Sequence, residues 1–399
     1  MTSHSAAARP DSIRRHNLGL LLGQIHRNGE LTRAQLTQRL HLSRSTIGAL
    51  VADLTELDLV DERIPTGGER AGRPSHVVGP RPSGPYVIAV DIDINHVVVA
   101  AVGIGGAVLA RHVIATARNP PRPQLVATQI GEAITILGAQ VDPAAWPVAI
   151  GVSVPGAVSR PAGIVEFAPN LNWRTEAFGA MLAAAAPAHL PVLLGNDADL
   201  AVLAEHLRGN ARDCSDVVYL MARIGVGAGI IVNGRPLRGH SGLAGEVGHN
   251  VVDASGPLCH CGKRGCVETY IGENALLEMA GRDVEASTEA VAAVFADARA
   301  GDEVAAKAVR SVAEALGRTI ASLANVLNPE RVLLGGSLSG VLDLAADEIT
   351  QALRDNTFEA LRSQPQLLPP GLGDDSSLLG AAELAFAALL TDPVGTRRE

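Results

Sequence analysis

The 399-residue sequence has no long apolar run, only four cysteines and, in its first 85 residues, no lysine. Its longest apolar stretches, such as 86–90 and 97–102, have the length of a strand and are far too short to cross a membrane. Four cysteines are too few for a disulfide scaffold. Because residues 1–17 contain no apolar segment of the kind a secretory signal needs, the sequence predicts a cytoplasmic protein with no membrane partner.

Positive charge is scarce overall and unevenly distributed. The 33 Lys and Arg side chains face 42 Asp and Glu, a formal net charge of −9, which excludes a uniformly basic nucleic-acid-binding chain. Residues 1–85, however, hold 11 Arg against 8 acidic side chains, a balance of +3, and the remaining 314 residues hold 22 basic against 34 acidic side chains, a balance of −12. The composition therefore allows a basic module joined to an acidic one, in a chain long enough for two or three domains.

Three short helices separated by tight turns are predicted near the N-terminus. Apolar side chains recur at helical spacing in 12–27, Asn28-Gly29 ends that helix, and Thr32 and Ser43 are natural N-caps for a second helix and a third at 43–60. A helix, a turn and a helix that begins with polar residues form the helix-turn-helix pattern, whose second helix meets base edges in the major groove. Arginine suits bidentate contact with guanine, and the candidate DNA-binding residues in this turn are Arg44, Ser45 and Thr46.

Residues 61–78 follow as a strand, a glycine-rich turn and a second strand, which is the pattern of a wing. Arg70 and Arg73 in the turn are candidates to contact a phosphate or a narrow minor groove. The helix pattern alone fits a small three-helix domain for protein contact equally well. The arginine-bearing turn favours DNA, because such a turn rarely serves packing. Residues 80–85, with three prolines, are expected to form a stiff linker.

From residue 86 onward apolar strands alternate with helical stretches, which indicates an α/β fold with mixed sheets. Three strands in a meander are expected from 86 to 114, with further strands at 148–154, 192–195, 217–222, 229–232 and 331–334. Helices are expected around 123–139, 176–186, 198–208, 272–280, 286–298, 302–327 and 378–390. The polar tail 391–399 is expected to be disordered.

Three of the four cysteines lie within eight residues, which predicts a metal site rather than disulfides. The candidate metal ligands are His249, Cys259, Cys261 and Cys266. Three thiolates and one imidazole make a closed tetrahedral set, the kind that structural zinc prefers. The alternative is a reduced cysteine-rich loop without metal, which the presence of all four residues of ligand type disfavours. His260 is expected to point outward, and Cys214 to be a buried apolar residue.

The sequence resembles the ROK family of repressors, open reading frames and kinases over nearly its whole length. The segment 245–268, GEVGHNVVDASGPLCHCGKRGCVE, matches the family's Glu-x-Gly-His element followed by Cys-x-Cys-Gly-x-x-Gly-Cys-x-Glu. The resemblance implies a winged helix-turn-helix followed by a two-lobed, actin-like or ribonuclease H-like sugar-kinase fold of the α/β class. The expected domains are a DNA-binding domain at 12–80, a first lobe at 86–200 completed by 376–391, and a second lobe with the zinc loop at 201–375.

The resemblance also implies a sugar site. The positions that match the family's sugar-contacting residues are Asn170, Asn172, Asn196, Asp197, Glu246, His249 and Glu268. In the family the His can contact the sugar as well as the metal, and in the kinases the residue matching Asp197 is the base that takes the proton of the attacked hydroxyl. Carboxylates and amides suit polyols, because each hydroxyl both donates and accepts. For each Asn alone, a local turn cap is an equally good explanation.

The segment that matches the family's first phosphate-binding loop distinguishes a kinase from a regulator. Kinases of the family carry Asp-x-Gly-Gly-Thr followed by Lys or Asn, whose small residues let backbone N–H groups approach ATP phosphates. Here residues 91–96 read DIDINH, so both glycines are missing and Asp93 brings a negative charge towards the phosphates. Glycines that resemble the other nucleotide elements remain, but glycine also suits strand-turn geometry without a nucleotide; they are Gly225, Gly227, Gly229, Gly335 and Gly336. Kinase activity is therefore disfavoured, which makes Asp197 a hydroxyl acceptor rather than a base.

These observations predict a zinc-containing transcriptional regulator, a repressor and at least a dimer, as a homodimer or homotetramer. Its winged helix would bind double-stranded operator DNA, and a sugar or sugar derivative in the cleft between the lobes would control that binding. One alternative is an ATP-dependent sugar kinase carrying a DNA-binding head. The other is a scaffold whose heads bind partner proteins.

Overall fold

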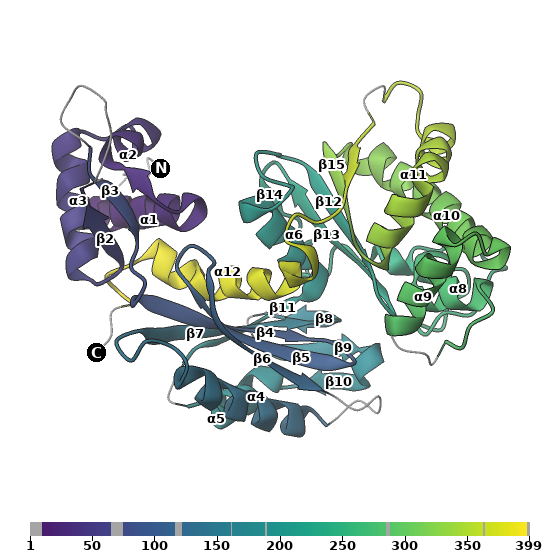
Figure 1. Ribbon diagram of the computed structural model, residues 1–399, viewed down its shortest axis with the longest axis horizontal. Helices are drawn as coiled ribbons and strands as arrows, with labels where there is room; N and C mark the ends of the chain where they lie inside the picture. The colour runs from purple at the N-terminus through teal and green to yellow at the C-terminus, as the bar shows by residue number, and fades with distance from the viewer. Residues whose placement is uncertain are drawn as a thin grey trace, which may run out of the picture.

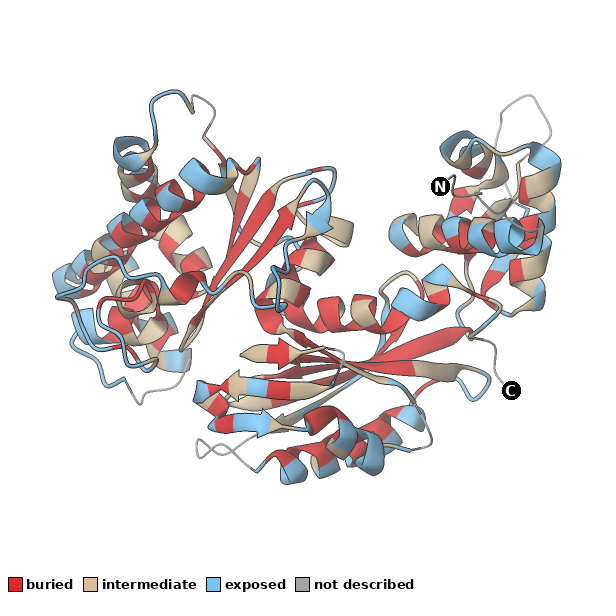
Figure 2. Cartoon of the chain, turned by 180° about the vertical axis from the view of Figure 1, so that it is seen from behind, coloured by how far each residue is buried: buried red, intermediate tan, exposed pale blue. Residues whose placement is uncertain are grey.

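The computed structural model describes residues 10–64, 75–115, 122–160, 162–187, 190–284, 288–361 and 364–396. A small N-terminal domain sits beside one end of a first α/β lobe, and a second α/β lobe stands beside its other end (Figure 1). Buried residues concentrate in the two central sheets and on the inner faces of the helices (Figure 2). Within the described residues, no helix is long and apolar enough to span a bilayer.

The N-terminal domain contains three helices and a small antiparallel sheet, which confirms the helix-turn-helix prediction. The helices are α1 (Pro10–Asn28), α2 (Arg33–Leu40) and α3 (Arg44–Glu56), and the sheet has the order β1-β3-β2, with β1 Leu31–Thr32, β3 Val77–Pro80 and β2 Val60–Arg63. Thr32 caps α2 in a capping box with Gln35. Ser43 caps α3 by accepting from the Thr46 N–H, as predicted.

One detail of this domain differs from the sequence prediction, and another lies outside the described residues. The third helix was expected to reach residue 60 but ends at Glu56, because Asp58 turns the chain with a left-handed φ of 60° and Val60 begins β2. The wing strands β2 and β3 pair as expected, but the turn with Arg70 and Arg73 lies outside the described residues.

The first lobe is built around a five-stranded sheet of order β11-β7-β4-β5-β6. The predicted meander is formed by β4 (Pro85–Ile92), β5 (His96–Gly103) and β6 (Val108–Ala115), and β7 (Trp146–Val154) and β11 (Val192–Asn196) complete the sheet in parallel with β4. Helices α4 (Pro123–Gly138) and α5 (Phe178–Ala185) cover one face, and the C-terminal helix α12 (Ser376–Thr391) covers the other (Figure 1). A second, three-stranded sheet that the sequence analysis did not predict joins β8 (Ala157–Ser159), β9 (Ile164–Ala168) and β10 (Trp173–Glu176).

The second lobe has a five-stranded sheet of order β14-β13-β12-β15-β16. Its strands are β12 (Val217–Ala222), β13 (Val226–Val232), β14 (Arg235–Pro236), β15 (Arg331–Gly336) and β16 (Gln366–Leu368). One face of the sheet packs on helices α7 (Glu268–Ile271), α8 (Glu273–Met279), α9 (Thr288–Arg299), α10 (Glu303–Leu327) and α11 (Ser337–Asn356). The other face packs on α6 (Asp197–Arg208), because alternate β12 residues such as Tyr219 and Met221 point to that side.

Helices α6 and α12 pack against each other between the lobes (Figure 1). The buried carboxylate of Glu205 in α6 fixes the start of α12, because it accepts hydrogen bonds from the backbone of Gly371 and Leu372 and from the Ser376 hydroxyl. Since each of these donors lies on or just before α12, the two helices form one unit.

The N-terminal domain is packed on the first lobe rather than suspended from a linker. Its buried side chains, such as Leu22 and Ile25, form one continuous apolar cluster with β4, β5 and α12, including Phe386. The tail was expected to be disordered from residue 391, but residues 392–396 are ordered: Asp392 forms an ion pair with Arg15, 3.3 Å apart, and Val394 packs on the same cluster.

Candidate functional site

The four predicted metal ligands come together in one loop of the second lobe. The ligand atoms of His249, Cys259, Cys261 and Cys266 all lie within 4.8 Å of one another. The Sγ atoms of Cys261 and Cys266 are 3.6 Å apart, and Cys259 Sγ is 3.7 Å from His249 Nδ1. These spacings fit a tetrahedron with metal–sulfur bonds of about 2.3 Å, whose edges are about 3.7 Å. The chemistry and spacing of the donors therefore suit a zinc-type ion.

The loop can close around these ligands only because Gly265 has no side chain. Its φ of 67° lies in the left-handed region, and an added Cβ would lie 1.6 Å from the carbonyl oxygen of Asp253. Burial raises the pKa of the Cys259 thiol to about 12, so a metal that binds there must displace a proton. His260 is exposed, as predicted, and Cys214 is buried in the core beneath α6.

A cavity of about 420 Å³ lies between the two lobes, beside the metal loop. It brings together six of the seven predicted sugar-contacting residues: Asn170, Asn196, Asp197, Glu246, His249 and Glu268. The volume is within the usual range for small-molecule sites, about 300–1,000 Å³. Asn172 is not in this cavity. It is exposed, ends a short 3-10 turn with a φ of 54°, and lines a separate hollow with His260.

The residues of the cleft are held by backbone contacts from several elements. Glu268, at the start of α7, accepts a hydrogen bond from the Val226 N–H of β13 at 3.3 Å, and its other oxygen lies 3.4 Å from Cys259 Sγ, which connects the cleft to the metal loop. Gly225 allows this arrangement, since an added Cβ would lie 3.1 Å from Glu268 and 3.2 Å from Asn170. Gly225, which resembles a glycine of the nucleotide-binding elements in the family kinases, thus has a packing role that needs no nucleotide.

Asn196 and Asp197 enter the cleft at the first turn of α6. The Asn196 side chain is an N-cap: its oxygen accepts from the Asp199 N–H, and its amide donates to the Gly156 carbonyl, both at 3.1 Å. Asp197 is 7% exposed and accepts from the N–H of Ala198. Burial raises the pKa of Asp197 to about 7, with Arg223 opposing the shift. A half-protonated carboxyl can both donate to and accept from a hydroxyl.

Arg223, which the sequence analysis missed, forms an ion pair across the two lobes. It follows β12 of the second lobe, and its Nη1 donates to Asp93 Oδ2 at 2.7 Å, where Asp93 follows β4 of the first lobe. Asp91 Oδ2 lies 3.9 Å from its Nη2. Although burial lowers the pKa of Arg223, the carboxylates of Asp93, Asp91 and Asp197 hold it above its ordinary value. The negative charge of Asp93 is therefore compensated by a neighbour 130 residues away.

A second cavity, of about 440 Å³, lies on the other side of this ion pair. It is lined by the 91–96 segment and by Gly336, the elements that match the nucleotide side of the family kinases. Five carboxylates line it, and both of its arginines are engaged: Arg111 with Asp375 at 2.9 Å and Arg223 with Asp93. The acidic lining would repel the phosphates of a nucleoside triphosphate.

The predicted DNA-contacting turn lies on the surface. Arg44 and Ser45 are exposed at the start of α3, and the hydroxyls of Ser45 and Thr46 each lie 2.8 Å from the Ser43 hydroxyl. Three other arginines of the domain and one of the linker form ion pairs with acidic residues of the domain, so they carry less free charge than their number suggests: Arg14 with Asp53, Arg33 with Glu62, Arg63 with Glu30 and, from the linker, Arg81 with Asp58.

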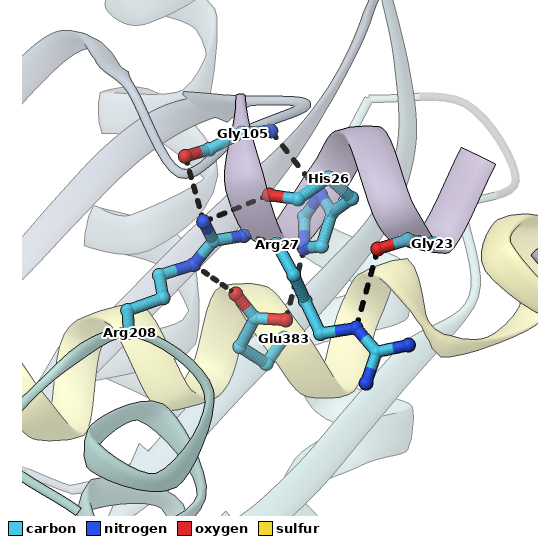
Figure 3. A network of polar contacts seen from close by, with 6 residues as sticks. All are labelled: Gly23, His26, Arg27, Gly105, Arg208 and Glu383. Atoms are coloured by element: carbon cyan, nitrogen blue, oxygen red, sulfur yellow. Dashed lines mark hydrogen bonds and ion pairs between the residues drawn. The ribbon is translucent and has the colours of Figure 1, made fainter. Parts of the chain in front are cut away.

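The far end of α6 meets the N-terminal domain in a buried polar cluster (Figure 3). Arg208, the last residue of α6, donates through Nε to Glu383 of α12 at 2.6 Å and through Nη1 to the backbone oxygens of His26 and Gly105 at 2.9 and 2.8 Å. His26 of α1 is 1% exposed and lies 2.9 Å from the second oxygen of Glu383. The Gly105 N–H donates to His26 Nδ1 at 3.2 Å, and His26 Nε2, which faces Glu383, also lies 2.6 Å from Arg208 Nη2.

Comparison with known proteins assigns the family. Residues 87–388 match the ROK family, and residues 19–71 match the MarR family. The chain belongs to the ROK family. Its MarR-type segment covers the helix-turn-helix, so this ROK chain has a DNA-binding domain ahead of the ROK lobes.

Relatives that match this ROK protein along its whole length are regulators. It is 27% identical to the xylose repressor of Bacillus spizizenii over 95% of this chain and 97% of the other. The crystal structure of a ROK family transcriptional regulator, a homologue of the Escherichia coli MLC protein, covers 96% of this chain and 98% of its own with a TM-score of 0.76 and 27% identity. A ROK glucokinase from Streptomyces griseus, in complex with glucose and AMPPNP, covers 98% of its own chain but only 75% of this one, with a TM-score of 0.63 and 30% identity. The chain is thus a ROK transcriptional regulator, and the kinases match its ROK part alone.

Proposed function

We propose that this ROK regulator is a repressor whose binding to operator DNA is controlled by a sugar in the cleft between its lobes. The observation that carries the proposal is the course of α6. This helix begins in the cleft at Asp197 and ends at Arg208, against the DNA-binding domain. Its 12 residues span about 18 Å, so a single rigid element connects the two sites.

The cleft supplies the groups that recognise a polyol. Glu268 and Asn170, which both lie close to Gly225, contribute acceptors and an amide donor, and Asp197 contributes a carboxyl. Glu246 and His249 border the same cavity from the metal loop. Asn196 holds the first turn of α6 in place and has one amide hydrogen and one lone pair left for a ligand.

The metal loop would hold zinc through His249, Cys259, Cys261 and Cys266. A zinc ion would supply a structural cross-link, because four protein ligands leave it no open position for catalysis. The loop between Glu246 and Glu268 would then keep these two carboxylates at the rim of the cleft. Metal analysis of purified protein should find one zinc ion per chain, and well below one would contradict the assignment.

The DNA contacts would come from the first turn of α3, with Arg44, Ser45 and Thr46, and from Arg70 and Arg73 of the wing turn. Operator sites for such domains are read as paired half-sites, so we propose a homodimer or a dimer of dimers as the binding unit. Domain limits of 12–80, 86–200 with 376–391, and 201–375 remain predictions within this proposal.

Sugar binding would reach the DNA-binding domain through α6 and α12. Closure of the lobes on a sugar moves the first turn of α6, and Glu205 and Glu383 transmit the shift because each joins α6 to α12. Arg208 passes the movement to the backbone of His26 in α1. The coupling requires that the sugar bind the two arrangements with different affinity.

The proposal is tested by fluorescence anisotropy with a duplex selected by the protein from a random library. D-xylose and D-glucose are the first sugars to titrate, and at least one sugar of a wider aldose panel should shift the DNA affinity by about 5- to 150-fold. Asn170→Ala should weaken the sugar response without changing the affinity for DNA. Asn172→Gly, which suits the left-handed φ of that position and lies outside the cleft, should retain the response. A response to no sugar, or equal loss in both variants, would contradict the proposal.

A further inference from the structure

We infer that the effector is an uncharged, unphosphorylated sugar, and that the Asp93–Arg223 ion pair sets this specificity by closing one end of the cleft. The inference rests on the proposed function, because it names the class of sugar for the same cavity. The location of the pair carries it: Asp93 and Arg223 line both the cleft and the second cavity, and so stand between the two.

The charges around the cleft are unfavourable for an anion. Five acidic side chains line it, namely Asp93, Glu166, Asp197, Glu246 and Glu268, and even with Asp197 half-protonated the carboxylates outnumber the one guanidinium, that of Arg223. A zinc ion held by three thiolates and a neutral imidazole would have a net charge of about −1 with its ligands, so the occupied metal centre itself would not attract an anion. A phosphate ester, with a charge of about −2, would meet repulsion from most of the wall.

Arg223 does not offer a phosphate site despite its charge. Its Nη1 donates to Asp93 at 2.7 Å, and the carboxylate of Asp91 lies 3.9 Å from its Nη2. A phosphate would have to displace one of these carboxylates and leave it buried without its cation, which is costly. Arg223 therefore lines the cleft with its charge already paired, and it does not act as an anion receptor.

A second arginine beside the cleft is also engaged. Arg160 lines a small adjoining cavity of about 30 Å³, where its guanidinium lies 3.3 Å from Asp199 Oδ2. Asp199 belongs to the first turn of α6, whose positive helix end is thus already occupied by Asp197 and Asp199. Within the described residues that line the cleft and this adjoining cavity, every guanidinium faces a carboxylate.

The ion pair also decides how far a sugar can extend. Because it joins the segment after β4 to the segment after β12, it closes the cleft where the two lobes approach each other. Hydroxyl groups can still bond to the paired carboxylate and guanidinium. A terminal phosphate would need the space that the pair fills, and the negatively lined second cavity behind it offers no compensation.

The test is isothermal titration calorimetry of the full chain with matched sugars: D-glucose against D-glucose 6-phosphate, N-acetyl-D-glucosamine against its 6-phosphate, and D-xylose. Where the protein binds a sugar, the free form should bind at least tenfold more tightly than its ester. An ester that binds as tightly as the free sugar would overturn the inference and leave the proposed function intact. If no free sugar or ester binds, the proposed function itself fails, and the inference with it.

The variant Asp93→Asn tests the role of the pair. It frees the charge of Arg223 but keeps an acceptor for the Ile94 N–H. The ratio of ester affinity to free-sugar affinity should rise at least tenfold. The control Asp343→Asn changes the net charge equally in the exposed pair with Arg299, and should leave that ratio unchanged. If Asp93→Asn folds, as circular dichroism can establish, and the ratio stays the same, the pair does not set the specificity.

Discussion

The Glu383→Gln substitution should both destabilise the protein and weaken the control of DNA binding by sugar. The wild-type carboxylate is 6% exposed and lies 2.6 Å from Arg208 Nε and 2.9 Å from His26 Nε2. Glutamine keeps the shape but loses the charge, which leaves the largely buried Arg208 guanidinium without its counterion. Loss of one partner from a buried ion pair costs about 3 to 5 kcal/mol, and the remaining hydrogen-bonding capacity of glutamine argues for the lower end of that range.

Two measurements check this prediction. Urea denaturation of the full chain should show a loss of about 3 kcal/mol in the free energy of unfolding, a large part of the 5–15 kcal/mol typical of a domain. In the anisotropy assay, DNA affinity should depend less on sugar, because the Arg208 guanidinium that links α6 to α1 is no longer fixed by the Glu383 carboxylate. Glu278→Gln, the same change at an exposed helix position, should alter stability by less than about 0.5 kcal/mol. A loss below about 1 kcal/mol in Glu383→Gln together with an intact sugar response would refute the reasoning.

The pH dependence gives an independent check on the same residue. Burial works against ionisation of Glu383, but His26 and Arg208 outweigh it and hold its pKa below the ordinary value of 4.5. A carboxyl whose pKa is lower in the folded protein contributes stability above its unfolded pKa and loses it as the pH falls through the folded value. The stability difference between wild type and Glu383→Gln should therefore be full above pH 4.5 and shrink at lower pH.

Three further predictions concern the other sites. Arg44→Ala should weaken binding to the selected duplex about tenfold or more while calorimetry shows unchanged sugar affinity, since a bidentate base contact contributes about 1–3 kcal/mol. Gly265→Ala should abolish zinc binding in metal analysis, because the new Cβ would overlap the Asp253 carbonyl. The control Gly262→Ala should keep the metal, because its new Cβ meets no atom within 4 Å and the substitution costs only about 1–2 kcal/mol of backbone strain. Burial raises the pKa of Asp197 to about 7, so the folded state binds an extra proton there and stability should fall as the pH rises from 3.8 to 7. Asp197→Asn should make this decline in the thermal midpoint of the sugar-free protein shallower without removing it, because burial also raises the pKa values of Asp199 and Glu273, to about 6 and about 7.

The parts of the molecule that sequence predicted well are those determined within short segments. The caps of α2 and α3 depend on residues three apart, Thr32 with Gln35 and Ser43 with Thr46, so their pattern can be read locally. The metal ligands lie within 18 residues of one another, and their spacing carries the geometry. The helix α11 could have been found by the same means, because its buried residues recur every three or four positions.

The contacts that sequence did not predict join distant parts of the chain. Asp93 and Arg223 are 130 residues apart, and His26 and Glu383 are 357 residues apart. No local pattern marks such a pair, since each residue alone resembles an ordinary solvated charge. The exclusion of Asn172 from the cleft is of the same kind, because it depends on how a 3-10 turn places two neighbouring asparagines in different hollows.

The packing of α1 on α12 has a consequence for the exchange of DNA-binding heads among regulators. Helices α1 and α12 lie far apart in the sequence but share one apolar cluster, so the head folds against a surface that a distant segment of the chain supplies. A head transplanted to another ROK body would need to bring α12 with it, or a matching replacement. A tag fused after residue 396 would emerge near Arg15, where α1 packs on the first lobe. A truncation before Ser376, which removes α12, should therefore weaken operator binding, although α12 and the head lie far apart in the sequence.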